Sequence, residues 1–182
     1  MKLEVEQKFA VPDLGQVQTR LLELGAKVGE PQLQVDQYFA HPSRDFAQTD
    51  EALRIRRIGQ SNFVTYKGPK IDATTKTRRE LELPLADGSQ AADEFGQLLA
   101  ALGFRSVGVV SKQRQPMALE WQGREVAVAL DQVEGLGPFV ELELESDESQ
   151  LPAARQALAS LAAQLGLTTG ERRSYLELLL AS

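Results

Sequence analysis

The 182-residue chain contains no cysteine, which excludes disulfides and thiolate metal sites. It also lacks an apolar run long enough to cross a bilayer, and its charged start does not lead into the apolar core of a signal peptide. A GxxxxGK[ST] phosphate loop is missing too, since "GLG" at 135–137 is better interpreted as a turn before a strand. These absences predict a cytoplasmic protein with no membrane partner.

Basic residues are the minority among the charges. Lys and Arg number 20 against 26 Asp and Glu, which gives a net charge of −6. This balance argues against a nucleic-acid partner, although it permits a local basic cluster. The single histidine, His41, lies in a predicted loop without partners at ligand spacing, so we expect a surface residue. A hydrophobic content of 42% and this length suit one folded domain over residues 1–182.

Four segments have the periodicity of amphipathic helices. In the first, Asp13 is a candidate N-cap and Gly25 a candidate stop signal. The predicted helices cover 11–27, 91–104, 151–166 and 171–180.

Polar and apolar residues alternate in most of the remaining chain, as is typical of half-buried strands. In "KLEVEQKF", residues 2–9, Glu4, Glu6 and Lys8 share one face and Leu3 and Val5 the other. No βαβ rhythm is present, so the pattern predicts a mainly antiparallel sheet. The same alternation gives later charged faces with Arg54 and Arg56; Lys67; Lys76, Arg78, Glu80 and Glu82; Lys112 and Arg114; Asp131; and Glu141, Glu143 and Glu145.

These charged faces have two interpretations. In the first, they form the solvated side of an antiparallel sheet and have no special purpose. In the second, the sheet closes into a barrel with the charges inside, and the amphipathic helices cover its apolar outer side. So many enclosed charges would need water, metal ions and a polyanionic ligand, because burying them unpaired is costly. Periodicity alone does not distinguish the two.

A resemblance to a known family favours the second interpretation. "EVEQK" matches the ExExK signature of the CYTH superfamily, the triphosphate tunnel metalloenzymes, which includes class IV adenylyl cyclases and thiamine triphosphatases. The chain resembles the class IV adenylyl cyclase branch most. The further matching segments are "DQYF" (36–39), "ALRIRR" (52–57), "TYKGPK" (65–70), "RRELEL" (78–83), "VSKQR" (110–114), "LDQVEGLGPFVELELE" (130–145) and "SYLELL" (174–179).

The resemblance implies an α+β fold, in which an eight-stranded antiparallel β-barrel forms a tunnel with flanking helices. It also implies roles for the inward residues. Oxygen ligands of the implied type suit Mg²⁺ or Mn²⁺. The implied metal ligands are Glu4, Glu6, Asp131, Glu141 and Glu143; the implied triphosphate ligands are Arg54, Arg56, Lys67, Arg78, Lys112 and Arg114; and Glu80 and Glu82 would orient them.

The function implied by the resemblance is metal-dependent chemistry on a triphosphate-bearing small molecule. The first candidate reaction converts ATP to cyclic AMP and pyrophosphate. The alternative is hydrolysis of inorganic or thiamine triphosphate, and a third option is a binding module without turnover. A homodimer is possible, since members of the family commonly pair.

Three residues are catalytic candidates by resemblance: Lys67, Tyr38 and Lys8. Tyr38 and Lys67 match a pair that assists water in the thiamine triphosphatase branch, which would require a lowered pKa of Lys67. Tyr38 could equally be a barrel tyrosine with a satisfied hydroxyl. After Arg114 the chain has "QPM", where some cyclase-like relatives carry an aromatic residue, and this departure weakens the case for adenine selectivity.

Overall fold

A computed structural model of the chain describes residues 2–69 and 77–182. Within these residues the strands form one sheet of nine, in the order β1-β9-β8-β7-β3-β4-β5-β6, and β2 pairs with β7 beside this path. Every pairing is antiparallel. The strands are β1 (Lys2–Ala10), β2 (Lys27–Val28), β3 (Gln32–Ala40), β4 (Ala52–Ile58), β5 (Ser61–Lys67), β6 (Glu80–Leu85), β7 (Arg105–Trp121), β8 (Arg124–Val133) and β9 (Gly137–Asp147).

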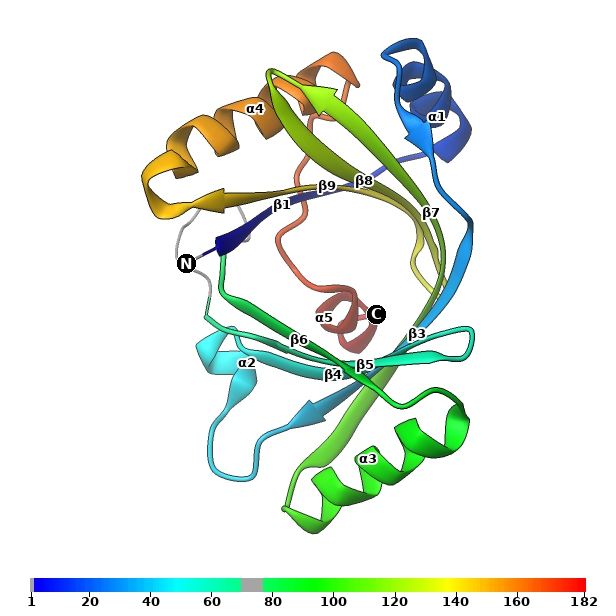
Figure 1. Ribbon diagram of the computed structural model, residues 1–182, viewed down its shortest axis with the longest axis vertical. Coiled ribbons are helices and arrows are strands. Elements are labelled where there is room, and N and C mark those ends of the chain that lie inside the picture. Colours follow the sequence, from blue (N-terminus) through cyan, green and yellow to red (C-terminus); the bar gives the residue numbers. More distant parts are fainter. Residues whose placement is uncertain (1, 70–76) are drawn as a thin grey trace.

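The eight strands of this path curl so far that the two ends of the sheet meet (Figure 1). Glu4 on β1 and Arg78, just before β6, form an isolated antiparallel bridge. Each backbone N–H donates to the other residue's carbonyl oxygen at 3.2 Å. The predicted antiparallel sheet, curled into a barrel with flanking helices, is therefore confirmed. Lys76, which the alternation groups with Arg78, lies outside the described residues.

All four predicted helices are present: three lie within the predicted bounds, and α3 begins two residues earlier and ends three residues earlier than predicted. The helix α2 was not predicted. The Asp13 side chain caps α1 by accepting from the backbone N–H of Gly15 at 2.7 Å. Gly25, just after that helix, has a φ of +87°, a left-handed conformation that favours glycine. The helices are α1 (Leu14–Glu23), α2 (Phe46–Thr49), α3 (Ser89–Ala101), α4 (Leu151–Gln164) and α5 (Tyr175–Leu180), and a 3₁₀ turn, η1 (Glu148–Gln150), precedes α4.

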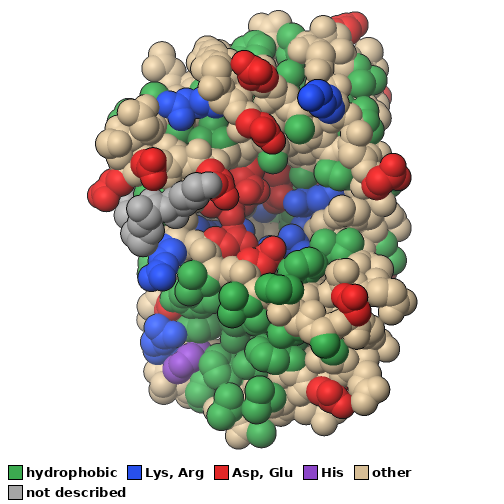
Figure 2. Space-filling model, viewed as in Figure 1, with side chains coloured by type: hydrophobic (Ala, Val, Ile, Leu, Met, Phe, Trp, Pro, Cys, Tyr) green, Lys and Arg blue, Asp and Glu red, His purple; other side chains and the backbone are tan. Residues whose placement is uncertain are grey.

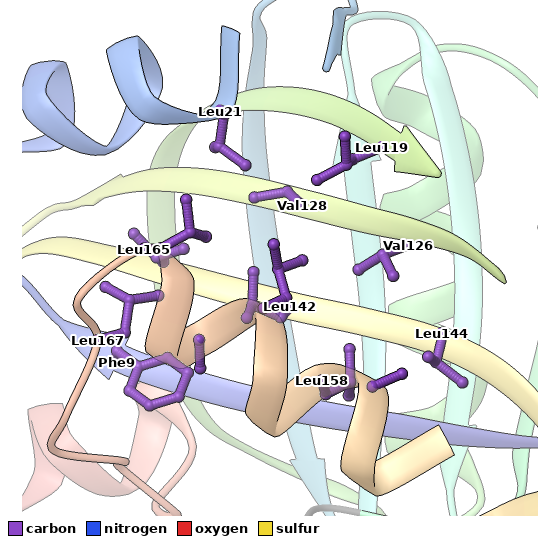
Figure 3. Packing of buried hydrophobic residues seen from close by; sticks show 14 of the residues in the cluster. Phe9, Leu21, Leu119, Val126, Val128, Leu142, Leu144, Leu158, Leu165 and Leu167 are labelled. Atoms are coloured by element: carbon purple, nitrogen blue, oxygen red, sulfur yellow. The ribbon is translucent and has the colours of Figure 1, made fainter. Parts of the chain in front are cut away.

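The main hydrophobic core lies outside the barrel wall. Val5 of β1, Leu142 of β9 and Leu158 of α4 have no exposed surface and belong to one cluster, to which α1 adds Leu21 (Figure 3). A second cluster packs α3 against Phe39 and Ile55 on the opposite side. The apolar faces of the strands thus point outward to the helices and the charged faces inward. The interpretation of the charged faces as a solvated sheet surface is wrong.

The interior of the barrel is not entirely charged. Tyr38, Val110, Val133, Phe139 and Tyr175 form a small apolar cluster, to which other α5 residues also contribute. A Cβ atom at Gly108 of β7 would lie 2.7 Å from Cδ1 of Leu176, so the absence of a side chain there lets α5 approach the inner wall. Within the described residues, no helix has the length and apolar character needed to span a membrane.

Candidate active site

A cavity of about 790 Å³ occupies the barrel, and Figure 2 shows acidic and basic side chains gathered in the corresponding hollow. Period-two alternation on the strands turns these side chains inward. The structure therefore brings together almost the whole set expected from the sequence. The expected residues that line the cavity are Glu4, Glu6, Lys8, Tyr38, Arg54, Arg56, Lys67, Arg78, Glu80, Glu82, Lys112, Arg114, Glu141 and Glu143.

One wall of the cavity carries carboxylates that face one another. Glu6 of β1 lies directly opposite Glu143 of β9 in the strand register. Like charges in this position repel, because their Cβ atoms are close. Burial raises the pKa of Glu143 to about 8, and the charges of Glu4, Glu6 and Glu141 add to the rise. The negative charges of this wall repel one another, and a cation bound between the carboxylates would reduce that repulsion.

The donors of this wall suit a hard divalent cation, since carboxylate oxygens are the ligands that Mg²⁺ and Mn²⁺ prefer. Cationic side chains already contact carboxylates of this wall. Lys67 Nζ lies 2.9 Å from Glu4 Oε1, and Arg114 Nη2 lies 2.5 Å from Glu141 Oε2. Among the described residues, no three acidic or histidine side chains have the arrangement of a formed metal site. A cation would therefore have to compete with these ion pairs.

The opposite wall is cationic and is anchored by a buried carboxylate that the sequence analysis did not single out. Asp36 of β3 binds Arg56 through two hydrogen bonds of 2.7 Å, from Nε to Oδ1 and from Nη2 to Oδ2. Its Oδ2 also lies 3.6 Å from Arg54 Nη1 and 3.8 Å from Lys112 Nζ. Within the described residues, Nε of Arg54 is buried without a hydrogen-bond partner.

Asp131 has a similar place behind Arg114. It has no exposed surface and accepts from Arg114 Nε at 2.7 Å and Nη2 at 2.6 Å. The hydroxyl of Tyr175 donates to its Oδ2 at 2.9 Å. Both oxygens of Asp131 thus hold protein groups, and in this structure the residue orients Arg114. Its role as a metal ligand stays a prediction.

The lowered pKa that a water-assisting role of Lys67 would require is not found. Burial alone lowers the pKa of this ammonium, but the charges of Glu4 and Glu80 outweigh it and raise the pKa above the usual range. Lys67 Nζ lies 2.6 Å from Glu80 Oε2 as well as close to Glu4. The lysine with a lowered pKa is Lys112, where burial and the charge of Arg114 bring the value to about 7.

The C-terminal segment engages Lys8, and Tyr38 lies close by. Lys8 Nζ donates to the carbonyl oxygen of Arg173 at 2.5 Å and lies 4.1 Å from the ring centroid of Tyr175. Tyr38 packs in the apolar cluster of Tyr175 and also lies beside Arg54, whose pKa it helps to raise. The interpretation of Tyr38 as a packed barrel tyrosine fits this place.

The remaining expected residues lie near the seam between the sheet ends. Arg78 Nη1 donates to the carbonyl oxygen of Asp50 at 3.1 Å, in addition to its backbone bridge with Glu4. Glu82 Oε2 accepts from Thr65 Oγ1 at 2.9 Å. The first contact joins the seam to the loop before β4, and the second joins β6 to β5.

One end of the cavity carries apolar side chains among charged ones such as Arg44 and Arg105, and the sequence did not predict this apolar surface. At the end where β3 finishes and β7 begins, the lining includes Phe46, Ala52, Val107, Leu176 and Leu180. Leu180 is 67% exposed and Val107 is 40% exposed. This end therefore offers uncovered apolar surface beside the charged walls. Its segments are α2, α5 and the start of β7, none of which pairs with the opening motif.

His41 lies half-buried in a loop, in agreement with the predicted loop, and it also lines this end of the cavity. Its ring lies 5.5 Å from the ring of Phe46 and 5.1 Å from that of Phe104, in an edge arrangement with the latter. Nδ1 accepts from the backbone N–H groups of Ser43 and Arg44, each at 3.1 Å. These contacts fold the loop against the apolar end of the cavity.

Comparison with known proteins agrees with this architecture. The family model for the CYTH domain matches residues 2–175. A Methanocaldococcus jannaschii protein, MJ0240, named as a candidate adenylate cyclase, is 38% identical over 179 residues, which are 97% of this chain and 98% of the relative. The solved PH1819 protein of Pyrococcus horikoshii has a TM-score of 0.86 and 40% identity, with 98% of each chain covered. HpAC1 of Hippeastrum, for which a dominant triphosphatase activity is described, shares the fold at a TM-score of 0.67 and 19% identity, covering 100% of this chain and 96% of that one.

Proposed function

The chain belongs to the CYTH domain family, and from this premise we propose that it is a metal-dependent enzyme that converts ATP to cyclic AMP and pyrophosphate. The observation that carries the proposal is the single cavity in which a carboxylate wall faces a wall of anchored cations beside an apolar end. The adenylate cyclase name of the Methanocaldococcus jannaschii relative supports the same reaction.

The cationic wall binds the triphosphate. Arg54, Arg56 and Arg114 present planar guanidinium groups, which bind phosphate oxygens in a bidentate manner. Lys112 adds an ammonium in the same wall and gains a proton when an anion approaches. These groups fix the phosphate chain so that the α-phosphorus meets the ribose 3′-hydroxyl in line.

Glu4, Glu6, Glu141 and Glu143 of the carboxylate wall would hold Mg²⁺ or Mn²⁺. The ion would supply positive charge toward the phosphates. Lys67 lies next to this wall and keeps its proton, because Glu4 and Glu80 raise its pKa. It therefore acts as a fixed positive charge toward the leaving pyrophosphate and does not accept the proton of the hydroxyl.

The apolar end receives the nucleoside. An inorganic triphosphate would gain nothing from Phe46, Val107 and Leu180, whereas a purine and a ribose would cover them. This end compensates for the missing aromatic residue after Arg114, because base-covering surface comes from α2, α5 and β7 instead.

Hydrolysis is the second candidate, and the triphosphatase activity described for the Hippeastrum neighbour favours it. The same two walls would bind inorganic or thiamine triphosphate, and water would attack the terminal phosphorus. A binding module would use the walls without turnover.

Product analysis separates these functions. The protein is incubated with Mg²⁺ or Mn²⁺ and with ATP, inorganic triphosphate or thiamine triphosphate, and the products are resolved by chromatography. We expect cyclic AMP and pyrophosphate from ATP. Orthophosphate as the dominant product would refute the cyclase and favour the hydrolase. The absence of product from every substrate with either metal would favour the binding module.

The carboxylate wall is tested with Glu6→Gln and Glu143→Gln, each of which should abolish turnover in a folded protein. Glu125→Gln is the matched control, because Glu125 faces Glu120 across β7 and β8 on an exposed part of the hairpin. Full turnover in both cavity variants would refute the metal assignment.

The apolar end is tested with Leu180→Asp. We expect the KM for ATP to rise about fivefold, from the lost apolar contact, while constants for inorganic triphosphate stay unchanged. Leu33→Asp is the control, since Leu33 is 51% exposed on the outer face of β3. An equal effect of Leu180→Asp on both substrates would contradict a nucleoside at this end.

A further inference from the structure

Asp36 contacts three cations of the cavity but lies behind them. Arg54, Arg56 and Lys112 line the cavity, whereas Asp36 is 1% exposed and its carboxylate is covered by these side chains. A carboxylate in this place cannot bind the substrate, because it would repel phosphate oxygens and has no open surface. Its contacts are directed at the groups that do bind.

The strand register explains how one carboxylate reaches all three cations. Asp36 on β3 pairs directly with Arg56 on β4, while Arg54 is two residues along the same face of β4. On the other side, β3 pairs with β7, where Lys112 lies two residues from Val110, the direct partner of Asp36. The central strand of the cationic wall therefore carries the one anion between cations of both neighbours.

Three positive charges packed this closely repel one another, and the effect is large where water is excluded. Arg56 is fixed most tightly, through two hydrogen bonds of 2.7 Å to the two oxygens of Asp36. Burial alone would raise the pKa of Asp36, but Arg54, Arg56 and Lys112 lower it well below the usual range, so the carboxylate stays ionised.

We propose that Asp36 is a positioning residue: its carboxylate holds Arg54, Arg56 and Lys112 at fixed separations, so that all three meet the phosphate oxygens of the substrate together. The inference rests on the proposed function of the cavity. Without Asp36 the wall keeps its positive charge and still attracts a triphosphate, but its donors are no longer aligned for the transition state. Loss of Asp36 therefore affects turnover more than binding.

The test compares the wild type, Asp36→Asn, Arg56→Gln, the double variant and Asp93→Asn. The asparagine keeps the size of the side chain and removes its charge. Asp93→Asn is the matched control. Asp93 of α3 pairs with Arg57 at 2.5 Å on the outer side of β4, the strand that carries Arg56, and its side chain is 57% exposed. Three quantities are measured: kcat and KM for ATP with Mn²⁺, and the dissociation constant of inorganic triphosphate by calorimetry.

We expect Asp36→Asn to lower kcat by at least about tenfold and to change KM by less than about threefold, with no effect of Asp93→Asn. In the double variant, the loss of kcat should be at least about fivefold smaller than the product of the two single losses. A kcat of Asp36→Asn within about twofold of the wild type would overturn the inference. A loss in the double variant equal to the product of the two single losses would overturn it as well.

The calorimetric arm separates this inference from the proposed function. If the wild type turns over no triphosphate, the proposed function fails, and the positioning role is then decided by the dissociation constants of the four cavity proteins. A combined loss of affinity in the double variant that is smaller than the product of the two single losses would support it, and independent effects would refute it. A fall in melting temperature with unchanged kinetic and binding constants would show a purely structural role.

Discussion

Replacing Glu143 by glutamine should stabilise the protein at alkaline pH in the absence of divalent cations, although it removes activity. Glu143 faces Glu6 across β1 and β9, and Glu4 and Glu141 lie near it. Burial and these charges raise the pKa of Glu143 from 4.5 to about 8. The uncharged glutamine keeps the shape of the side chain and removes the repulsion.

The pH window follows from the raised pKa. Between pH 4.5 and about 8 the folded protein retains a proton that the unfolded chain has already released, so the stability present at low pH is lost as the pH rises through this window. A pKa rise of this size lowers the free energy of unfolding by at most about 5 kcal/mol. Because the side chain is partly open to water in the cavity, we expect the wild type to be less stable than Glu143→Gln by about 2 kcal/mol above pH 8. For a chain of this length that is about 4–8 °C in melting temperature.

Thermal unfolding with a chelator at pH 5 and pH 9 measures the effect. Glu143→Gln should melt above the wild type at pH 9 and close to it at pH 5, while Glu125→Gln should change neither value. Added Mg²⁺ or Mn²⁺ should raise the melting temperature of the wild type more than that of Glu143→Gln, because a ligand of the folded state stabilises it. A variant that melts below the wild type at pH 9, or shifts equally at both pH values, would refute the reasoning.

Three further outcomes follow from single contacts. The pKa of Lys112 is about 7, so binding of inorganic triphosphate at pH 8 should take up close to one proton. Calorimetry in two buffers of different ionisation enthalpy measures this uptake, and uptake that persists in Lys112→Met would contradict the assignment. Gly108→Ala should cost about 1–3 kcal/mol in denaturant unfolding, because its Cβ would lie 2.7 Å from Leu176 Cδ1; Leu176→Ala should recover most of it, and a failure to do so would exclude this clash as the cause. Arg54→Gln should weaken inorganic triphosphate and ATP alike, by about tenfold or more in the dissociation constant, and a loss confined to ATP would move Arg54 from the phosphate chain to the nucleoside.

The inward side chains were predictable because a strand repeats every two residues. Once Glu4, Glu6 and Lys8 share a face, the register of an antiparallel sheet sets them against the matching face of β9. The direction of that face was not predictable from periodicity, since a half-buried strand and a tunnel wall have the same pattern. The family resemblance decided it, and the helices packed outside the barrel confirm it.

The chemistry of individual groups was less predictable, because it depends on strands that are distant in sequence. Lys67 of β5 meets Glu4 of β1 only because the sheet closes at the seam before β6. That meeting reverses the direction of the pKa shift expected in a cationic tunnel. Asp36 has the same alternation as its neighbours, and nothing in the sequence says that it lies between three cations. For α5, the helix was predicted, but neither its capping box of Ser174 and Glu177 nor its place against the inner wall was.

The location of the core explains how a fold can keep so many charges inside. Ion pairs such as Lys67 with Glu4 add little net stability in a buried site, since desolvation offsets their attraction. The stabilising apolar area lies elsewhere, between the outer face of the strands and α1, α3 and α4, where Val5, Leu142 and Leu158 are fully buried. The interior can then hold opposed carboxylates and crowded cations at some cost, because the outer core supplies the stabilising apolar area. Substitutions of the two kinds should therefore separate: changes in the outer core lower stability first, whereas changes in the cavity alter binding and turnover and, at Glu143, even raise stability.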